Sequence, residues 1–493
     1  MDVDFSSQLL RLHYPAGKYR DGRDWQAVDE LRPMSLLKAD LPVLFSYTVK
    51  DELLPAPERA RPRQETQAEI LLRTVASGNA WEDAWVSFWR DHFSVNGYDN
   101  NVGAFLPHWE REIIQRNAFG NFRSFLEATA THPCMLYYLN NRSSRAGSAN
   151  ENYARELFEL HTLGREVYLN HLYAQWREVP GALNGEPKGY IDQDVYEAAR
   201  CFTGWTLEDG TNIGAGQSLP KTGKFIYLES WHDNYQKRVL ARDFDPYAGP
   251  MHDGRRVLDL CAYHSSTARH LMTKLVKRMI SDSPPESIIS GCVKVFVENQ
   301  KAPDQLQRVS TYLAKEILSI PKVKRQKVRS PERLVAKFTT AVKLPFVLGE
   351  GKILSIVESA GPPVYGWVSP EGPPDGLAWL LSAGYLRQRF TLIQGLAENW
   401  WGSGEWDPFN GLSSTRTYSE LMARWDIQLF GLVRPDLCKA LLQSQGLNSE
   451  STIKDVKQAR RLVGLLACAP SFQTEAIEPN ERPSKKLIER VKK

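Results

Sequence analysis

The run from Asn150 to Gly164 alternates hydrophobic and polar positions in a way that predicts one amphipathic helix. Tyr153, Leu157 and Leu160 fall at i, i+4 and i+7, so they would form a buried stripe along this helix. The opposite face would be polar, which makes it either a functional site or a lattice of salt bridges. It carries Glu151, Arg155, Glu156, Glu159 and His161.

The two ends of this helix carry capping signals. Ser148 and Glu151 have the spacing of a capping box, and Asn150 offers an alternative cap. Gly164 supplies a C-terminal stop. Glu151 and Arg155 are also i, i+4 partners in the favourable order, which predicts an ion pair.

A second helical pattern has an aromatic face. Trp85, Phe88 and Trp89 recur at helical spacing, and His92 completes the same row. His92 is therefore expected to point the way the tryptophans point.

Three shorter patterns complete the local predictions. Residues 193–202 form a helix behind an Asp192 cap, and residues 267–280 form a helix with a buried apolar stripe. Residues 224–228 are the best strand candidate, and they lie in a long segment rich in Gly, Asp and aromatic residues.

These patterns predict a mainly α, multi-helix globular protein with a short β-containing insertion at about 206–250. Residues 361–376 hold five prolines and four glycines, so we expect an ordered loop there. The expected organisation is an N-terminal appendage and linker (1–63), a helical core lobe (64–320), a C-terminal helical lobe (321–473) and a mobile basic tail (474–493).

Composition narrows the class of protein. The 493 residues contain 62 Lys and Arg and 58 Asp and Glu, so the net charge is +4. This is too small an excess of positive charge to indicate nucleic-acid binding. Basic clusters at 322–329 and 482–493 lack interleaved aromatics and are better explained as a solvated loop and tail. Six scattered cysteines without a CxxC pair indicate reduced thiols, and no apolar run is long enough for a membrane span. We expect a cytoplasmic protein that binds neither nucleic acid nor membrane.

Short motifs are spread along residues 64–473: Phe-Trp-Arg-Asp-His-Phe at 88–93, then 150–164, 194–200 with 203–205, 232–233 with 237, 264–274, 327–331 and 466–473. In order and spacing they resemble the bacterial "domain of unknown function 1800" family. The resemblance implies a largely helical protein with no settled activity. It also suggests a protein partner, because the family is often encoded beside a sulfatase-like family. Arg90 stands where the family usually shows another histidine.

A metal site is one hypothesis for the polar residues. Helical proteins hold divalent metals with carboxylates and imidazoles that project inward from several helices. The tentative ligands are His92, Glu156, His161 and His232, and a divalent metal would be the cofactor. The paired Glu-x-x-His spacing of di-iron bundles is absent, because Glu159 is followed by His161 at the second position.

Acid–base chemistry is a second hypothesis. A carboxylate beside a histidine orients it for proton transfer, so His232 and Asp233 are candidates, with Lys237 holding an anionic group. His264 opens a helix whose free backbone N–H groups could bind an anion together with Arg269. Ordinary capping of that helix by Ser265 or Ser266 is the alternative.

The resulting function hypothesis is an enzyme, hydrolase or oxidoreductase, with a polar pocket around a small anionic substrate. Its catalytic candidates are Glu156, Glu159, His161, His232, Asp233 and Lys237. Its substrate-binding candidates are Arg155, Arg200, His264, Arg269 and Lys274. The alternative is a non-catalytic binding or assembly protein in which the same acids and bases form an interhelical salt-bridge network, because buried charges need partners.

Overall fold

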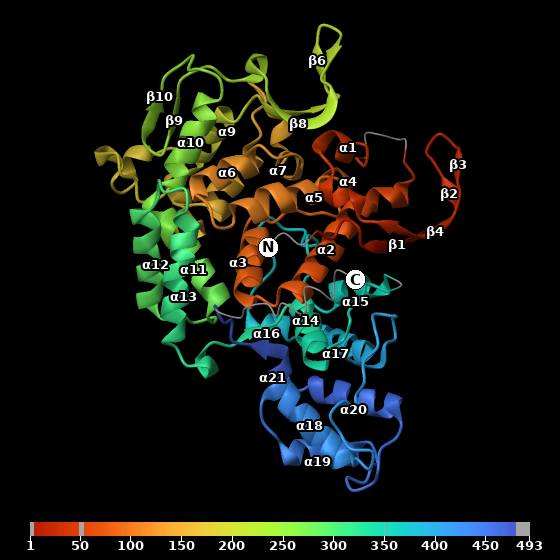
Figure 1. Ribbon diagram of the computed structural model, residues 1–493. Helices are drawn as coiled ribbons and strands as arrows, with labels where there is room; N and C mark the ends of the chain where they lie inside the picture. Colours follow the sequence, from red (N-terminus) through yellow and green to blue (C-terminus); the bar gives the residue numbers. More distant parts are fainter. Residues whose placement is uncertain (1–3, 49–53, 350, 480–493) are drawn as a thin grey trace.

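A computed structural model describes residues 4–48, 54–349 and 351–479 of the chain. Helix α2, Arg61–Ser77, runs through the middle of the molecule (Figure 1). Its two sides belong to different hydrophobic cores, since Ile70 packs in one and Leu71 and Leu72 pack in the other. Helix α2 therefore joins the two halves of the protein.

The first core lies among helices that follow α2 in the sequence, and the predicted aromatic face is part of it. Trp85 and Trp89 on α3 are fully buried there. The helices of this half are α1 Leu41–Phe45, α3 Ala80–His92, α4 Asn100–Gly103, α5 Leu106–His108, α6 Phe122–Ala130, α7 Pro133–Tyr138, α8 Glu151–Glu156, α9 Asp192–Cys201, α10 His252–Ala262, α11 Ser265–Met279, α12 Glu286–Glu298 and α13 Gln305–Leu318.

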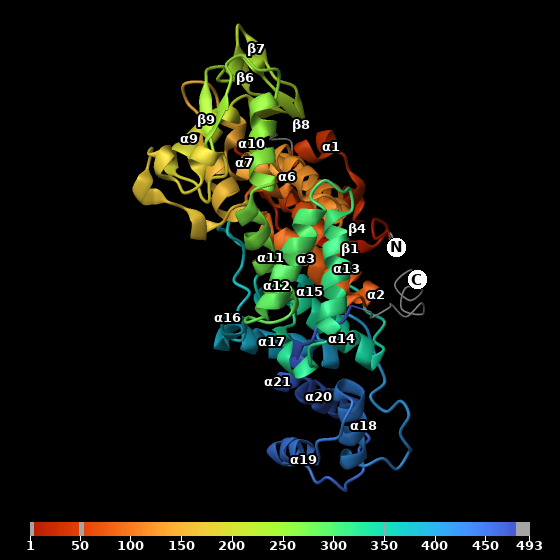
Figure 2. The ribbon, with the colours of Figure 1, turned by 90° about the vertical axis from the view of Figure 1, so that its left-hand side faces the viewer.

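The second core gathers the C-terminal helices and part of the N-terminal segment. Phe5, Leu10 and Met34 pack in it together with the C-terminal helices, so this part of the N-terminal segment contributes to a core of the protein. Its helices are α14 Pro331–Val342, α15 Lys352–Ser359, α16 Leu377–Leu380, α17 Ala383–Glu398, α18 Tyr418–Phe430, α19 Pro435–Ser444, α20 Val456–Ala467 and α21 Pro470–Gln473. In Figure 2 the blue helices α18 to α20 lie at the opposite end of the molecule from strands β6 to β8.

All strands of the described chain are short and pair in two-stranded antiparallel sheets. Strand β8 covers residues 224–227 of the strand predicted at 224–228, and it pairs with β5 inside the expected insertion. The strands are β1 Leu9–Tyr14, β2 Gly17–Lys18, β3 Asp24–Trp25, β4 Val28–Pro33, β5 Trp205–Asp209, β6 Asn212–Gly214, β7 Gln217–Ser218, β8 Lys221–Tyr227, β9 Lys237–Val239, β10 Arg242–Phe244, β11 Lys327–Val328 and β12 Thr474–Glu475. The mainly α prediction is confirmed.

Two parts of the expected organisation can be compared with the structure. Within the expected N-terminal appendage and linker (1–63), α2 begins at Arg61. Pro62 sits in the first turn of this helix, where its missing N–H costs nothing. The expected mobile tail (474–493) begins with strand β12, which pairs with β11, and its residues 480–493 lie outside the described residues. No helix among the described residues is long and apolar enough to cross a membrane.

Candidate functional site

The predicted helix at 150–164 changes its geometry halfway along. Asn150, not Ser148, is its cap, because the Asn150 side chain accepts a hydrogen bond from the Asn152 backbone N–H at 2.9 Å. After Glu156 the α-helix continues as a π-helix, Leu157–His161. The wider turn carries His161 off the predicted polar face into the interior, where only 1% of it is exposed. π-turns are frequent at functional sites.

His161 joins a cluster of nitrogen bases contributed by three elements. The His92 Nε2–H donates to the His161 backbone oxygen at 3.2 Å, so His92 Nδ1 is left as an acceptor. Lys274 on α11 places its Nζ 3.3 Å from that Nδ1. His270, one turn earlier on α11, donates from Nε2 to the Leu160 backbone oxygen at 3.1 Å. Of the predicted site residues, His92, His161 and Lys274 are therefore brought together.

Burial decides the ionisation of this cluster. It lowers the pKa of Lys274 to about 8 and that of His161 to about 3, and it holds the pKa of His92 well below its usual value. Near neutral pH both imidazoles are uncharged. The cluster therefore contains one ionisable amine among neutral bases.

Two carboxylates of the same helix, Glu156 and Glu159, have different surroundings. Glu159 pairs with Arg165, which also reaches Glu371 of the 361–376 loop at 3.4 Å. Glu156 has no ion-pair partner among the described residues. Burial and the nearby Glu159 raise the pKa of Glu156 to about 7. The predicted pair of Arg155 and Glu151 is present at 3.4 Å.

The tentative metal site is not found in the structure. Within the described residues, no group of three or more His, Cys, Asp or Glu side chains is arranged to hold a metal ion. Two of the four tentative ligands explain why. His92 uses both ring nitrogens in contacts with His161 and Lys274, and His232 belongs to a different cluster.

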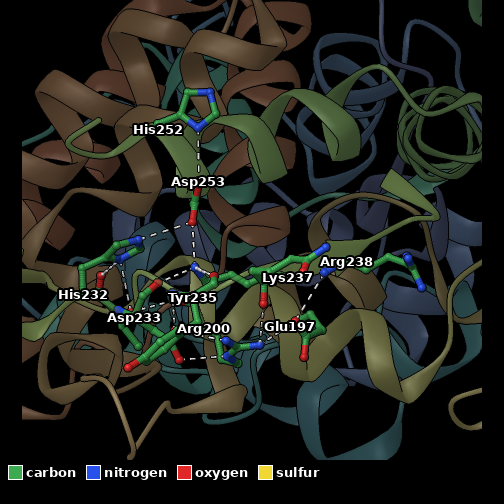
Figure 3. Close-up of polar contacts among 11 residues, drawn as sticks. Glu197, Arg200, His232, Asp233, Tyr235, Lys237, Arg238, His252 and Asp253 are labelled. Carbon is green, nitrogen blue, oxygen red and sulfur yellow. Dashed lines mark hydrogen bonds and ion pairs between the residues drawn. The ribbon is translucent and has the colours of Figure 1, made fainter. Parts of the chain in front are cut away.

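His232 and Lys237 meet at a carboxylate that the sequence did not indicate. Lys237 donates to Asp253 Oδ2 at 2.8 Å, and His232 Nε2 lies 3.4 Å from the same oxygen (Figure 3). Asp253 comes from α10, and the Lys237 side chain is fully buried. Burial works against the ionised carboxylate of Asp253, but the His232 and Lys237 contacts hold its pKa well below the usual range. This arrangement has the form of a buried ionic network.

Asp233 does not orient His232, although the two are adjacent in sequence. It accepts two hydrogen bonds from Arg200, at 2.8 and 3.1 Å, and Arg200 also binds Glu197 (Figure 3). The His232 Nδ1 instead donates to the Thr203 backbone oxygen at 2.9 Å. The predicted dyad is therefore replaced by an ion pair that links α9 to the segment before β9.

The anion site predicted at the start of α11 is occupied by protein contacts. His264 is itself the N-cap, since its Nδ1 accepts from the Ser266 N–H at 3.1 Å and its Nε2 donates to the Pro187 backbone oxygen at 2.9 Å. Arg269 makes a two-pronged ion pair with Glu286 on the surface. Neither His264 nor Arg269 keeps a side chain free for a ligand.

A cavity of about 530 Å³ lies between the two cores, and sequence reasoning did not find it. The loop at 361–376 forms one side, with Tyr365 and Trp367 in the lining. Helix α3 lines it with the face opposite its tryptophans, where Asp83, Ser87 and Asp91 recur every fourth residue. That i, i+4, i+8 polar row was the available signal for this site.

Ion pairs surround the cavity. Arg278 on α11 binds Asp91 at 2.6 Å and Asp375 of the loop at 2.9 Å. On another wall, Arg333 binds Asp83 at 3.3 Å and Glu475 at 2.8 Å. These contacts fix the charged side chains at the boundary between the two halves of the protein.

Several of these groups have altered acidity. Burial raises the pKa of Asp83 to about 7, although Arg333 partly offsets it. Burial also raises the pKa values of Asp91 and Glu332, and it lowers that of Arg389 to about 10. Perturbed acids that line a cavity are candidates for catalytic groups.

Comparison with known proteins identifies the family. The sequence model of the family described as "Protein of unknown function (DUF1800)" matches residues 11–474. The chain belongs to the DUF1800 family. No curated protein and no solved structure matches the chain.

In this DUF1800 protein, three of the family-like motifs meet at the cavity. The motif at 88–93 supplies Asp91, and the motif at 327–331 supplies Arg329 and Ser330. The motif at 466–473 supports the wall from behind, since Gln473 Oε1 accepts from the Arg389 Nε–H at 2.9 Å. Motifs far apart in the sequence therefore converge on the boundary between the two cores.

Proposed function

We propose that the protein is an enzyme that binds a small molecule with an anionic group in the cavity between its two cores and acts on it by proton transfer. The observation that carries this proposal is the Asp83 carboxyl. It lines that cavity, and burial raises its pKa to about 7. A carboxyl that titrates near neutrality can both give and take a proton at working pH.

The size and lining of the cavity support the same proposal. A volume of about 530 Å³ falls within the usual range of small-molecule sites, roughly 300 to 1,000 Å³. Both aromatic and charged side chains line it, which suits a ligand with an apolar body and a polar end. The basic side chains of the lining would hold the anionic group.

Titration calorimetry tests this proposal. The probes are inorganic phosphate, citrate and benzoate, each measured near pH 7 in two buffers that differ in ionisation enthalpy. We expect saturable binding of at least one probe, with proton exchange that is lost in Asp83→Asn. Asp259→Asn is the matched control, because Asp259 is an exposed carboxylate that also pairs with an arginine. Absence of saturable binding by all three probes contradicts the proposal.

The alternative is a non-catalytic binding or assembly protein. The observation that favours it is the network around Asp253, in which the predicted catalytic residues His232 and Lys237 both contact that buried carboxylate. In this case the protein partner would be the sulfatase-like neighbour that the family resemblance suggests. Co-purification of the two proteins, with no proton-linked ligand binding, would favour this alternative.

We further propose a cytoplasmic location. All six cysteines are unpaired, and five of them are buried. Unpaired thiols are typical of reducing compartments. Fractionation of cells that express the full-length protein tests this proposal.

A further inference from the structure

The charged side chains around the cavity differ in how much surface they offer to a ligand. Arg73, Asp91 and Asp375 keep 36%, 32% and 31% of their side-chain surface accessible, and Arg278 keeps 22%. The ion pairs of Arg333 on another wall are less accessible, since Arg333 keeps only 15% of its side-chain surface exposed. Because the first four all line the cavity, their accessible surface is what a ligand in the cavity would meet.

Arg73 provides a free donor at this surface. Its Nε and one terminal nitrogen both donate to a single oxygen of Glu69. Within the described residues, the other terminal nitrogen has no hydrogen-bond partner. A guanidinium with a free N–H group in a cavity is a site for a carboxylate or phosphate.

Asp91 provides the matching free acceptor. Its Oδ2 binds Arg278, whereas its Oδ1 has no partner among the described residues. Burial raises the pKa of this carboxyl, so a cationic group in the cavity would restore the favourable environment that the carboxylate lacks. Both terminal nitrogens of Arg278 already donate to protein groups, to Asp91, Asp375 and Ser87.

Charges of both signs line the cavity, which contains seven Lys and Arg and six Asp and Glu. Within the described residues, Arg73 has a free donor and Asp91 has a free acceptor. Such a pair of free groups fits a ligand that carries both charges.

We infer that this cavity takes a small zwitterion of amino-acid or dipeptide size, with its anionic group on Arg73 and its ammonium group on Asp91. The apolar part would rest on Tyr365 and Trp367 of the 361–376 loop. The inference rests on the proposed function, because it names the ligand class of the same cavity.

The first experiment measures thermal stabilisation of the full-length protein by the standard L-amino acids and a set of dipeptides, followed by calorimetry on those that stabilise it. At least one zwitterion is expected to bind saturably. Failure of every zwitterion in the wild-type protein overturns the inference.

The second experiment uses analogues with the same body. If phenylalanine is the ligand, 3-phenylpropanoate lacks the ammonium and 2-phenylethylamine lacks the carboxylate, and each should bind about tenfold or more weakly. Asp91→Asn should remove the preference for phenylalanine over 3-phenylpropanoate. Arg73→Gln should remove the preference for phenylalanine over 2-phenylethylamine. Arg308→Gln is the matched control, because Arg308 makes the same kind of i, i+4 pair on the surface.

The analogues also separate this inference from the proposed function. Equal or tighter binding of the simple carboxylate overturns the zwitterion assignment and leaves an anion site that the proposed function predicts. Zwitterion binding that is unchanged in both Asp91→Asn and Arg73→Gln places the ligand elsewhere and overturns the assignment to this cavity.

Discussion

Lys274 Nζ lies 3.3 Å from His92 Nδ1. The Nε2–H of the same imidazole donates to the His161 backbone oxygen, so Nδ1 is the nitrogen that accepts. The contact joins α11 to α3 at the point where the π-helix turns inward. An amine that meets an uncharged imidazole is stabilised less in its charged form than one that meets a carboxylate. Burial is the main cause of the lowered pKa of Lys274, and a neutral imidazole offsets the lost hydration less than a carboxylate would.

We predict that Lys274 titrates near pH 8 in the folded protein. Reductive methylation with ¹³C-formaldehyde followed by NMR titration of the methyl signals measures this directly, and Lys274→Arg assigns the signal. Lys277, which is exposed on the same helix, is the reference. Identical titration curves for the two lysines would contradict the prediction.

Removal of one member of the buried network at Asp253 should destabilise the fold. Lys237→Met leaves the buried Asp253 carboxylate without its ammonium partner, so we expect a loss of about 3 to 5 kcal/mol in the free energy of unfolding. Urea denaturation at pH 7 provides the measurement. Lys294→Met is the control, since Lys294 makes an exposed i, i+4 pair whose loss costs about 0.5 kcal/mol or less. Similar midpoints for the two variants would show that the network is not stabilising.

Gly164 should not tolerate a side chain. Its φ of +95° and ψ of 155° fall in a region that is almost restricted to glycine, and an added Cβ would lie 2.6 Å from His270 Nδ1. Gly164→Ala is expected to cost about 3 kcal/mol. Gly147→Ala is the comparison, because Gly147 also has positive φ but open space around it, and it should cost about 1 kcal/mol. Equal losses in the two variants would contradict the prediction for Gly164.

Glu156 should make stability depend on pH. Its folded pKa of about 7 lies above the ordinary value of 4.5, so the native state binds more protons than the unfolded state between these values. Its contribution is present below about pH 4.5 and is lost as pH rises through 7. Glu156→Gln should therefore gain stability over wild type at pH 8 and little at pH 5, as measured by urea denaturation. Glu186→Gln, at an exposed carboxylate, should show no such change between the two pH values.

Much of the fold could be predicted from the sequence because its signals are local. The aromatic row of α3 and the apolar stripe of α11 follow from helical spacing, and both were buried as expected. The candidate site was less predictable. His232 was paired with its neighbour Asp233, but its carboxylate partner Asp253 lies on another element.

The sequence by itself determined which segments are helical, which faces are apolar and which family the chain resembles, because these depend on residues within one or two turns of each other. Only the tertiary structure decided three things: that His161 turns inward through a π-helix, that Lys237 finds Asp253, and that a cavity opens between the two cores. The physical reason is that buried charges seek partners through space. Several residues can satisfy the same charge, and only the packing of distant segments selects one of them.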